Sequence, residues 1–303
     1  MVISACGSPY DFFCTRRIAH LCCAKTVFEL REPWPELHRE KYPDEDSRMM
    51  RAVADYAMDF TLKNADLIVS LLPKGEEYLR RRGIRPHEYC FAQAPMPPLP
   101  HPAPLRPEEA EMLNALRERY PFLVAYTGSL TARRMPELLV EAVGRLREQG
   151  AAAVLAGNGG DKMLLRRCIR ENGWDNILML DAMPEGRQYT LCRMADAVYH
   201  GNDRKTDAEF GAYEPFLLRQ MQMGRPLLMA AYGGEDPVRR CDAGVYAPEL
   251  TVEGVKAALR QLISFSEEKR EKMGESAFTA LQERHDPLRI ANEYRSALLR
   301  LWR

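Results

Sequence analysis

Short apolar runs alternate with longer amphipathic stretches along this chain. The alternation is clearest in the second half, where a helical pattern follows each apolar run. Such short runs are typical of strands that are buried on both faces. Strands that alternate with helices predict a parallel sheet with helices on both sides. We expect these strands at residues 122–126, 152–156, 177–180, 197–200 and 226–229.

The first half repeats the pattern on a smaller scale. Pro33 and Pro35 cannot donate to a sheet ladder, so residues 32–36 are predicted to form a loop. Around this loop we expect strands at residues 2–5, 26–31, 65–71 and 89–92, and helices at residues 10–25, 47–64 and 74–82.

A proline-rich stretch separates the two halves. Seven prolines lie between residues 94 and 107, which predicts a stiff, extended linker. The predicted divisions are an N-terminal domain over residues 1–94, a linker over 95–107, a C-terminal domain over 108–280 and a final helix over 281–303 that crosses back to the N-terminal domain.

The charges balance, because the chain has 43 lysines and arginines and 43 aspartates and glutamates. A neutral chain lacks a broad basic surface, so we expect no nucleic-acid partner. No run approaches the roughly 20 apolar residues of a membrane span. The first residues also lack the basic and apolar regions of a signal peptide. We therefore expect a cytoplasmic protein.

The eight cysteines include no C-x-x-C pair, so we expect reduced thiols that fill core positions. His20 lies near Cys14, Cys22 and Cys23. Adjacent cysteines on a helix point about 100° apart, however, which is unsuitable for shared ligation. We therefore predict no metal site.

Residues 122–136 are the strongest candidate for chemistry. A buried strand leads into a turn at Gly128, then to Arg133 and Arg134, and then to a helix that begins near Pro136. Glycine lets backbone approach a ligand, a helix N-terminus offers free N–H groups, and arginine adds positive charge. The stretch suits an anion. An ordinary strand–helix unit with solvated arginines explains it equally well.

Several short pieces have a distinctive order and spacing. They are Tyr126-Thr-Gly-Ser-Leu, Pro136-Glu-Leu-Leu-Val-Glu-Ala, Val154-Leu-Ala-Gly-Asn-Gly, Trp174-Asp-Asn-Ile, Met194-Ala-Asp-Ala-Val, Gly224-Arg-Pro and Ala243-Gly. Together they resemble the donor-binding domain of GT-B glycosyltransferases, specifically the retaining family-4 kind. The stretches that begin at Val27 and Asn64 resemble the acceptor domain of bacterial polysaccharide and lipopolysaccharide glycosyltransferases. The fold class implied is α/β, with two Rossmann-like parallel-sheet domains of which the N-terminal one is truncated.

The resemblance implies transfer of a sugar from a nucleotide diphosphate with retention of the anomeric configuration. It implies no metal and no cofactor, because basic side chains and helix N-termini neutralise the diphosphate of the substrate. Arg134 holds the place of the family's lysine, and Ser129 that of a nearby arginine. The implied donor-binding residues are Gly128, Ser129, Arg134, Gly157, Asn158, Gly159, Glu214, Pro215 and Phe216.

The chain departs from the family at the E-x7-E motif. Counted back from Gly224, the two glutamates fall on Gly211 and Arg219, and an arginine cannot accept a hydrogen bond. Glu209 and Glu214 lie nearby with the wrong spacing. Glu214, at a helix start, also fits an ordinary capping role.

A second departure is at the N-terminus, because family members have further strands before the point that corresponds to Val2. Residues 2–5 are therefore expected to form an exposed sheet edge, which is an association hazard. We expect a second copy, a partner chain or a rearranged terminus to cover this edge.

On the acceptor side, Arg31, Glu32 and Trp34 follow a strand at the end where ligands usually bind. Glu32 is the candidate base for the acceptor hydroxyl, and a plain loop-capping role is equally open. Trp34 either stacks on an acceptor sugar or simply packs. The arginines at 80–82 either meet an anionic lipid head group or form a solvated helix end.

Three functions stay open. The first is a glycosyltransferase that uses a nucleotide sugar and a glycan or lipid-linked acceptor, peripheral to the inner face of the membrane. The second is a non-catalytic or truncated relative that acts through a partner chain, which the missing glutamates and strands favour. The third is a nucleotide-sugar epimerase, which would need the same acidic contacts.

Overall fold

The computed structural model describes residues 1–5, 8–43, 48–93, 95–211, 214–234 and 236–302. Cys6, the predicted helix start at Ser47 and the predicted boundary at Ala94 lie outside these residues. The chain divides into two compact units. The first comprises Met1–Met96, Arg204–Glu214 and Arg284–Arg303, and the second comprises Pro97–Asp203 and Pro215–Glu283. Residues 204–214, predicted to lie in the C-terminal domain, therefore belong to the first unit.

The first unit contains a four-stranded parallel sheet in the order β1-β2-β3-β4. The strands are β1 (Val2–Ser4), β2 (Thr26–Leu30), β3 (Leu67–Ser70) and β4 (Tyr89–Phe91). The helices are α1 (Asp11–Leu21), α2 (Trp34–Lys41), α3 (Arg48–Asn64), α4 (Gly75–Arg81), α9 (Lys205–Phe210) and α14 (Pro287–Arg300).

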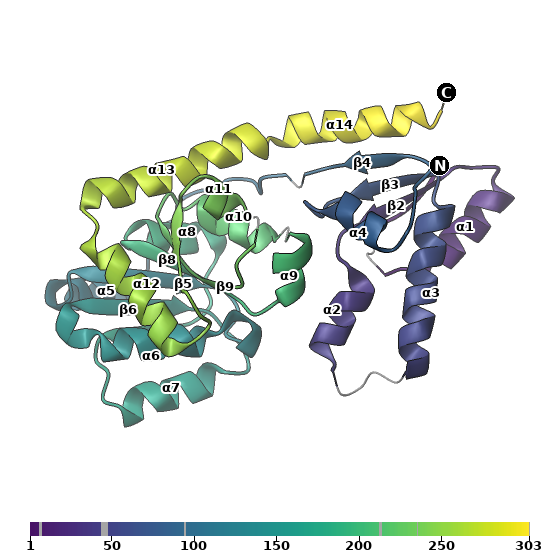
Figure 1. Ribbon diagram of the computed structural model, residues 1–303. Coiled ribbons are helices and arrows are strands. Elements are labelled where there is room, and N and C mark those ends of the chain that lie inside the picture. Colours follow the sequence, from purple (N-terminus) through teal and green to yellow (C-terminus); the bar gives the residue numbers. More distant parts are fainter. Residues whose placement is uncertain (6–7, 44–47, 94, 212–213, 235, 303) are drawn as a thin grey trace. The chain divides into compact units, whose positions relative to one another are not determined.

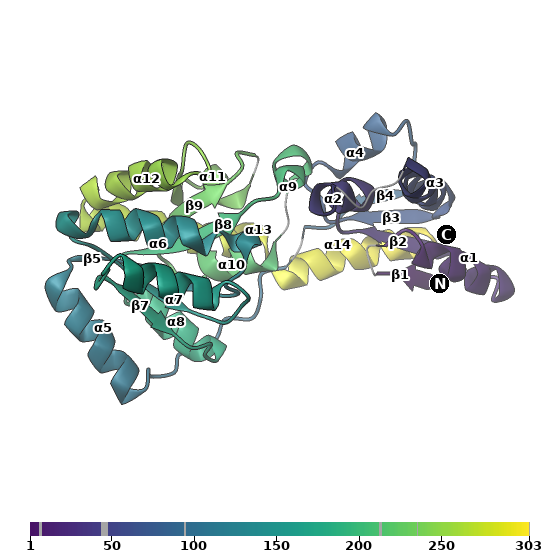
Figure 2. The same cartoon turned by 90° about the horizontal axis from the view of Figure 1, so that it is seen from below.

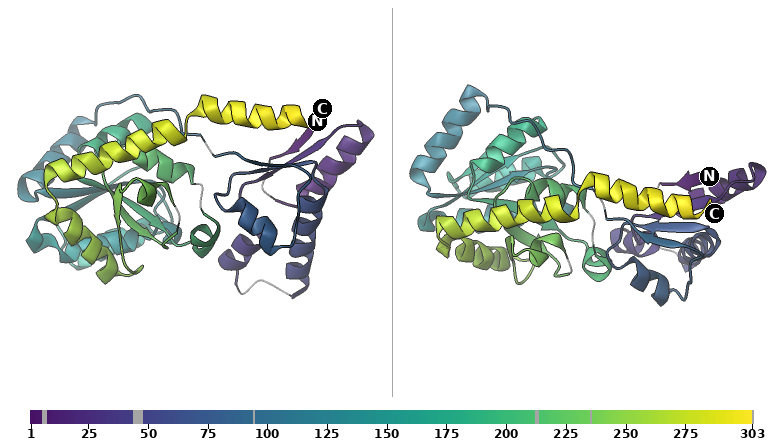
Figure 3. Two further views of the ribbon diagram at one scale, coloured as in Figure 1. Left: turned by 45° about the horizontal axis from the view of Figure 1, so that its top comes forward. Right: turned by 90° about the horizontal axis from the view of Figure 1, so that it is seen from above.

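Both faces of this sheet are covered by helices (Figure 1). On one face Phe28 and Ile68 pack with Phe12 of α1, and all three side chains are fully buried. On the other face Val27 and Val69 pack with the last helix, α14. Figure 3 shows α14 lying along this sheet. Successive residues of each strand thus pack into cores on opposite faces of the sheet. For this reason the strand sequences are apolar throughout.

The prediction of a loop over residues 32–36 is wrong, because α2 begins at Trp34. Pro33 is the N-cap of this helix and Pro35 lies in its first turn. The N–H groups of the first helical turn have no acceptor within the helix, so proline, which lacks an N–H group, is tolerated there. The two prolines exclude a strand and favour a helix start.

A short helix, α9, was not predicted and joins the first unit. Glu40 of α2 accepts hydrogen bonds from the backbone N–H (3.0 Å) and the hydroxyl (2.8 Å) of Thr206. At the other end of α9, the ring of Phe210 lies 5.1 Å from that of Tyr78, edge to face. Six residues are too few for a helical period to be recognised in a sequence.

The second unit contains a six-stranded parallel sheet in the order β10-β9-β8-β5-β6-β7. The strands are β5 (Phe122–Thr127), β6 (Ala151–Ala156), β7 (Ile177–Leu180), β8 (Ala197–Asn202), β9 (Leu227–Ala231) and β10 (Gly244–Tyr246). The α-helices are α5 (Pro107–Arg119), α6 (Pro136–Arg145), α7 (Lys162–Glu171), α8 (Glu185–Arg193), α10 (Pro215–Met221), α11 (Pro237–Arg240), α12 (Val252–Ser264) and α13 (Glu267–Arg284).

The central strand β5 has a core on each side. Val124 and Leu155 pack with Val143 of α6 on one face. Ala125 packs with Leu191 of α8 on the opposite face. Figure 2 shows α6 and α7 next to each other. The packing fixes the carboxyl ends of the strands, where the loops of the candidate site begin.

The expectation that the cysteines fill core positions is wrong for Cys14, Cys22 and Cys23, whose side chains are exposed. Cys192 is buried, and its burial raises the pKa of the thiol to about 12. Among the described residues, no helix combines the length and the hydropathy of a transmembrane span.

Candidate functional site

Two glycine-containing turns lie against each other at the carboxyl ends of β5 and β6. The N–H of Gly128 donates to the carbonyl of Ala156 (3.1 Å), and the N–H of Leu130 donates to that of Asn158 (2.9 Å). The predicted donor-binding residues on these two turns are therefore neighbours in space. The carboxyl ends of parallel strands are the usual place for ligands in such sheets.

The two turns touch backbone to backbone, which only glycine permits. A Cβ atom at Gly157 would lie 1.9 Å from the carbonyl oxygen of Gly128. A Cβ atom at Gly159 would lie 2.0 Å from that of Leu130. Gly128 itself has a φ of 151°, which other residues rarely adopt. Ser129, which follows Gly128 in the chain, is exposed, and its carbonyl accepts from the Tyr126 hydroxyl at 2.6 Å.

Arg134 is held at the ends of β5 and β8. Its Nη1 atom donates to the carbonyl of Gly201 at 3.3 Å. A Cβ atom at Gly201 would lie 1.8 Å from the carbonyl oxygen of Arg134, so the backbones are also in contact. The next residue, Met135, has left-handed backbone angles (φ 46°, ψ 46°), which are uncommon for a non-glycine residue. The Tyr199 hydroxyl, 2.8 Å from the Met135 carbonyl, fixes this turn.

Phe216, in the first turn of α10, covers the Gly128 turn. A Cβ atom at Gly128 would lie 2.9 Å from the Cζ atom of this ring. The guanidinium carbon of Arg134 lies 4.6 Å from the ring centre, and the His200 ring centre lies 5.9 Å away. The predicted Pro215 is the exposed first residue of α10. The predicted Glu214 belongs to the first unit, whereas these turns belong to the second.

The sequence did not predict the acidic side chains near the same strand ends, because they belong to no family motif. Partial burial raises the pKa of Glu137, and the carboxylates of Asp161 and Asp203 raise it further. Lys162 adds a positive charge at the Asn158 turn, where its Nζ atom donates to Asn158 Oδ1 (2.7 Å) and to Asp181 Oδ1 (2.6 Å). An anionic ligand at these turns would therefore meet charges of both signs.

Neither expected glutamate position offers a carboxylate. Gly211 packs within the first unit, because a Cβ atom there would lie 2.7 Å from that of Pro73. Arg219 donates to the carbonyl of Pro98 and to Gln222 Oε1 (3.1 Å), and it pairs with Glu185 at 3.3 Å. Its donors are thus committed to the linker and to α8.

The acceptor-side residues lie in the first unit. Arg204 Nη1 donates to Glu32 Oε1, whose side chain is 47% exposed. Arg31 pairs with Glu29 at 2.7 Å. The Trp34 ring packs edge-on against Tyr10, with 5.3 Å between the ring centres. Glu32 is therefore accessible next to a cation, whereas Trp34 has a packing partner.

Two of the three arginines at the end of α4 have acidic partners. Arg82 donates to Glu36, Asp55 and Asp59 at 2.9, 2.8 and 2.7 Å, and only 11% of its side chain is exposed. Arg81 pairs with Glu77 and Glu209. The expectation of a solvated helix end is wrong for Arg82, which ties three helices together.

Metal ligands do not cluster in the described part of the chain, where no three histidine, cysteine, aspartate or glutamate side chains form a candidate metal site. That the reaction needs neither a metal nor a cofactor stays a prediction.

Solved structures resemble the whole chain. Anabaena HepE in complex with UDP and glucose matches with a TM-score of 0.65 at 15% identity, over 95% of this chain and 75% of that one. Sucrose-phosphate synthase from Thermosynechococcus elongatus matches with a TM-score of 0.67 at 16% identity, over 92% and 68%. WaaG, a glycosyltransferase involved in lipopolysaccharide biosynthesis, matches with a TM-score of 0.62 at 14% identity, over 97% and 84%. The chain has a fold of the GT-B type.

The predicted fold class of two Rossmann-like parallel-sheet domains is thereby confirmed. These neighbours are GT-B glycosyltransferases that depend on nucleotide sugars. No family model and no curated protein sequence matches the chain. Identity near 15% establishes the fold alone, so the family-4 assignment stays a prediction.

Proposed function

We propose that this protein is a retaining, family-4-like glycosyltransferase that moves a sugar from a nucleotide diphosphate to a polysaccharide or lipid-linked acceptor. One observation carries the proposal. The backbone contact between Gly157 and Gly128 lies at the carboxyl ends of the strands, in a GT-B fold, with Arg134 on the same loop.

On the donor side, Arg134 supplies positive charge to the diphosphate. Its planar fork can donate two parallel hydrogen bonds to one phosphate group. Gly157, Asn158 and Gly159 line the nucleoside pocket, and Ser129 adds a hydroxyl donor. The Phe216 ring must move aside or form the wall of this pocket, because it covers Gly128.

On the acceptor side, Glu32 takes the proton of the attacking hydroxyl. The acceptor oxygen forms its bond to the anomeric carbon on the same face from which the diphosphate leaves, so that the bond to the diphosphate breaks and the configuration is retained. Arg204 orients the Glu32 carboxylate through their hydrogen bond of 3.1 Å. General-base assistance of this kind contributes roughly 10²–10⁴-fold to a rate.

Calorimetry of the full chain against UDP, GDP, ADP and CMP tests the donor half. We expect saturable binding of one base and a loss of at least about tenfold in Arg134→Ala, because a charge-assisted hydrogen bond contributes about 1.5–3 kcal/mol. The matched control is Arg145→Ala, which removes an exposed arginine that pairs with Glu141 on α6. Absence of binding by every nucleotide at millimolar concentration contradicts the proposal.

A non-catalytic relative is the second candidate, and Arg219 favours it. Where the family has a glutamate for the ribose hydroxyls, Arg219 is held by Pro98, Gln222 and Glu185. Such a protein would act through a partner chain. Nucleotide binding without transfer or hydrolysis of any nucleotide sugar would favour this candidate.

The open edge at β1 supports self-association or a partner chain. β1 pairs with β2, and no described strand lies on its other side. Ile3 on this strand is 43% exposed. We expect light scattering of the purified chain to report a dimer, and a monomer would contradict self-association.

A further inference from the structure

The second sheet ends at β7, and one side of this strand is open. The N–H of Ala153 donates to the carbonyl of Asn176 (3.0 Å), and that of Gly157 donates to Leu180 (3.5 Å). Since backbone groups alternate in direction along a strand, those of Ile177 and Met179 point to the outer side. No described strand pairs with them there.

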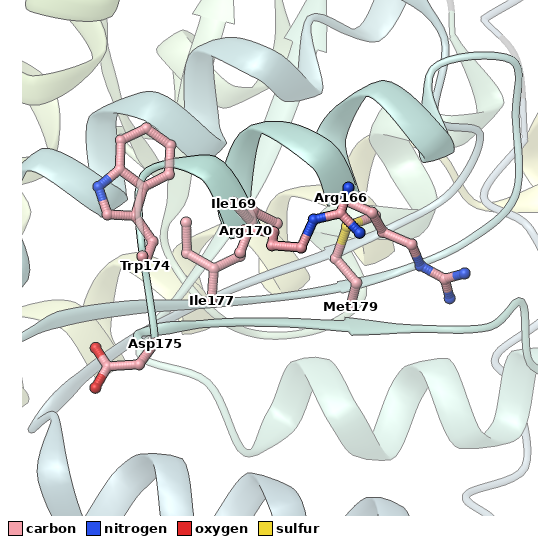
Figure 4. A pocket seen from close by; sticks show the side chains of 8 residues that line it. Arg166, Ile169, Arg170, Trp174, Asp175, Ile177 and Met179 are labelled. Carbon is pink, nitrogen blue, oxygen red and sulfur yellow. The ribbon is translucent and has the colours of Figure 1, made fainter.

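A hollow of about 360 Å³ lies along this open side, next to α7. Its floor is apolar and contains Ile169, Ile177 and Met179, with Trp174 at one end (Figure 4). The indole of Trp174 is fixed against α6, because a Cβ atom at Gly144 would lie 2.2 Å from it. The hollow is thus a built feature with a rigid aromatic wall.

The charge around the hollow is positive. Arg166 and Arg170 are four residues apart, so they leave the same side of α7, as Figure 4 shows. Within the described residues the Arg170 guanidinium has no ion-pair partner. Arg166 lies 3.7 Å from Asp181, whose Oδ1 atom already accepts from Lys162 at 2.6 Å.

Asp175, the acidic residue that lines the hollow, does not neutralise the charge of Arg166 and Arg170. Asp175 accepts from the Tyr120 hydroxyl at 2.7 Å and pairs with Arg119. These hydrogen bonds lower the pKa of Asp175 and commit its carboxylate elsewhere. The arginines of the hollow therefore suit a carboxylate from outside the chain.

We propose that β7 and this hollow dock an extended acidic segment of a partner protein, which adds to the sheet as a further strand. The outward backbone groups of Ile177 and Met179 would pair with the main chain of the segment. Side chains two positions apart on the segment face the same side. One apolar side chain would enter the hollow, and an acidic one would reach Arg166 and Arg170.

The observations favour a peptide over a membrane surface. The hollow is concave, and its backbone donors and acceptors are directional, which a lipid head group does not require. Met163 and Leu164 at the start of α7 are exposed apolar residues that a membrane could bind, but they do not line the hollow.

The test is fluorescence anisotropy of the full chain with a labelled eight-residue peptide in which threonine fills every second position and valine and glutamate alternate at the positions between, so that valine and glutamate face the same side. We expect saturable binding that weakens with salt and falls at least tenfold in Arg166→Glu/Arg170→Glu. The matched control is Arg167→Glu, on the same helix, because Arg167 pairs with Glu171 at 2.7 Å outside the hollow. A peptide with proline in place of threonine and valine should not bind, because it lacks most of the N–H groups needed for strand pairing.

The conservative variant Arg166→Lys/Arg170→Lys keeps the positive charge, so it should retain most of the binding. Circular dichroism reports whether each variant is folded. Absence of peptide binding, or equal binding by all folded variants, overturns the proposal. Arginine-dependent binding of phosphatidylglycerol vesicles without peptide binding also overturns it, in favour of a membrane surface.

Discussion

Arg204 Nη1 lies 3.1 Å from Glu32 Oε1, although 172 positions separate the two residues in the sequence. Both residues belong to the first unit, whereas the glycine turns and Arg134 belong to the second. A substitution of the candidate base, Glu32, should therefore leave the folding of the candidate donor loops unaffected.

Glu32→Gln should lower the transfer rate at least about 100-fold, because glutamine cannot take the acceptor's proton. Nucleotide affinity should stay within about twofold, since the donor loops are untouched. A transfer assay beside calorimetry checks both expectations. Unchanged transfer by this variant would remove Glu32 from the reaction.

Gly157→Ala should destabilise the protein, because its new Cβ would lie 1.9 Å from the Gly128 carbonyl oxygen. Forcing a methyl group into a packed site costs about 1–3 kcal/mol. We expect the melting temperature to fall by about 2–12 °C. Gly160→Ala is the matched control, because nothing lies within 4 Å of its Cβ position. Equal melting temperatures for the two variants would contradict the backbone contact.

Phe216→Ala should tighten nucleotide binding several-fold while it lowers stability. The ring covers Gly128 and lies 4.6 Å from the Arg134 guanidinium carbon, so its removal frees both for the diphosphate. Loss of a half-buried aromatic side chain lowers the free energy of unfolding by about 1–3 kcal/mol. Calorimetry and thermal unfolding measure the two effects. Weaker binding in the variant would instead make Phe216 a wall of the nucleotide pocket.

Asp66→Asn should lower stability at neutral pH and have little effect in acid. Burial raises the pKa of Asp66, but hydrogen bonds from Thr26 and Lys25, at 2.8–2.9 Å, outweigh it and lower the pKa. A carboxyl whose pKa is lower in the folded protein stabilises it above the unfolded value, about 3.9, and this stability is lost as the pH falls through the folded value.

Thermal unfolding from pH 7 to pH 3 measures this effect. The Asp66→Asn variant should lose about 1 kcal/mol at pH 7, and the difference from the parent protein should shrink below about pH 4. Glu118→Gln, an exposed change on α5, should have no such pH dependence. A constant difference at all pH values would contradict the ionic origin of the effect.

Most of the fold was predictable from the sequence because burial on both sheet faces leaves an unmistakable apolar run, as in β5 and β6. The short elements were not predictable. β10 has three residues and α9 has six, which is less than a recognisable period. At α2 the missing N–H of proline predicts a loop, whereas its fixed φ favours the first helical turn that the structure contains.

The sequence predicted which turns belong to the candidate site, but not how these turns contact one another. The glycines at 128 and 157 were identified by order and spacing, but their contact joins separate strands and no local pattern encodes it. The same holds for Arg204 and Glu32. The repulsion around Glu137 arises from Asp161 and Asp203 on other loops, so it also depends on the folded chain.

The division of the chain has a consequence for its synthesis. The second unit has all of its residues once translation has passed Glu283, whereas the first unit starts at Met1 and still lacks α14 at that moment. The face of Val27 and Val69 that α14 covers is therefore open on the nascent chain until α14 leaves the ribosome. The first unit, whose strands are translated before the second unit, is therefore completed after it. A chaperone has more time to bind the incomplete first unit than the second.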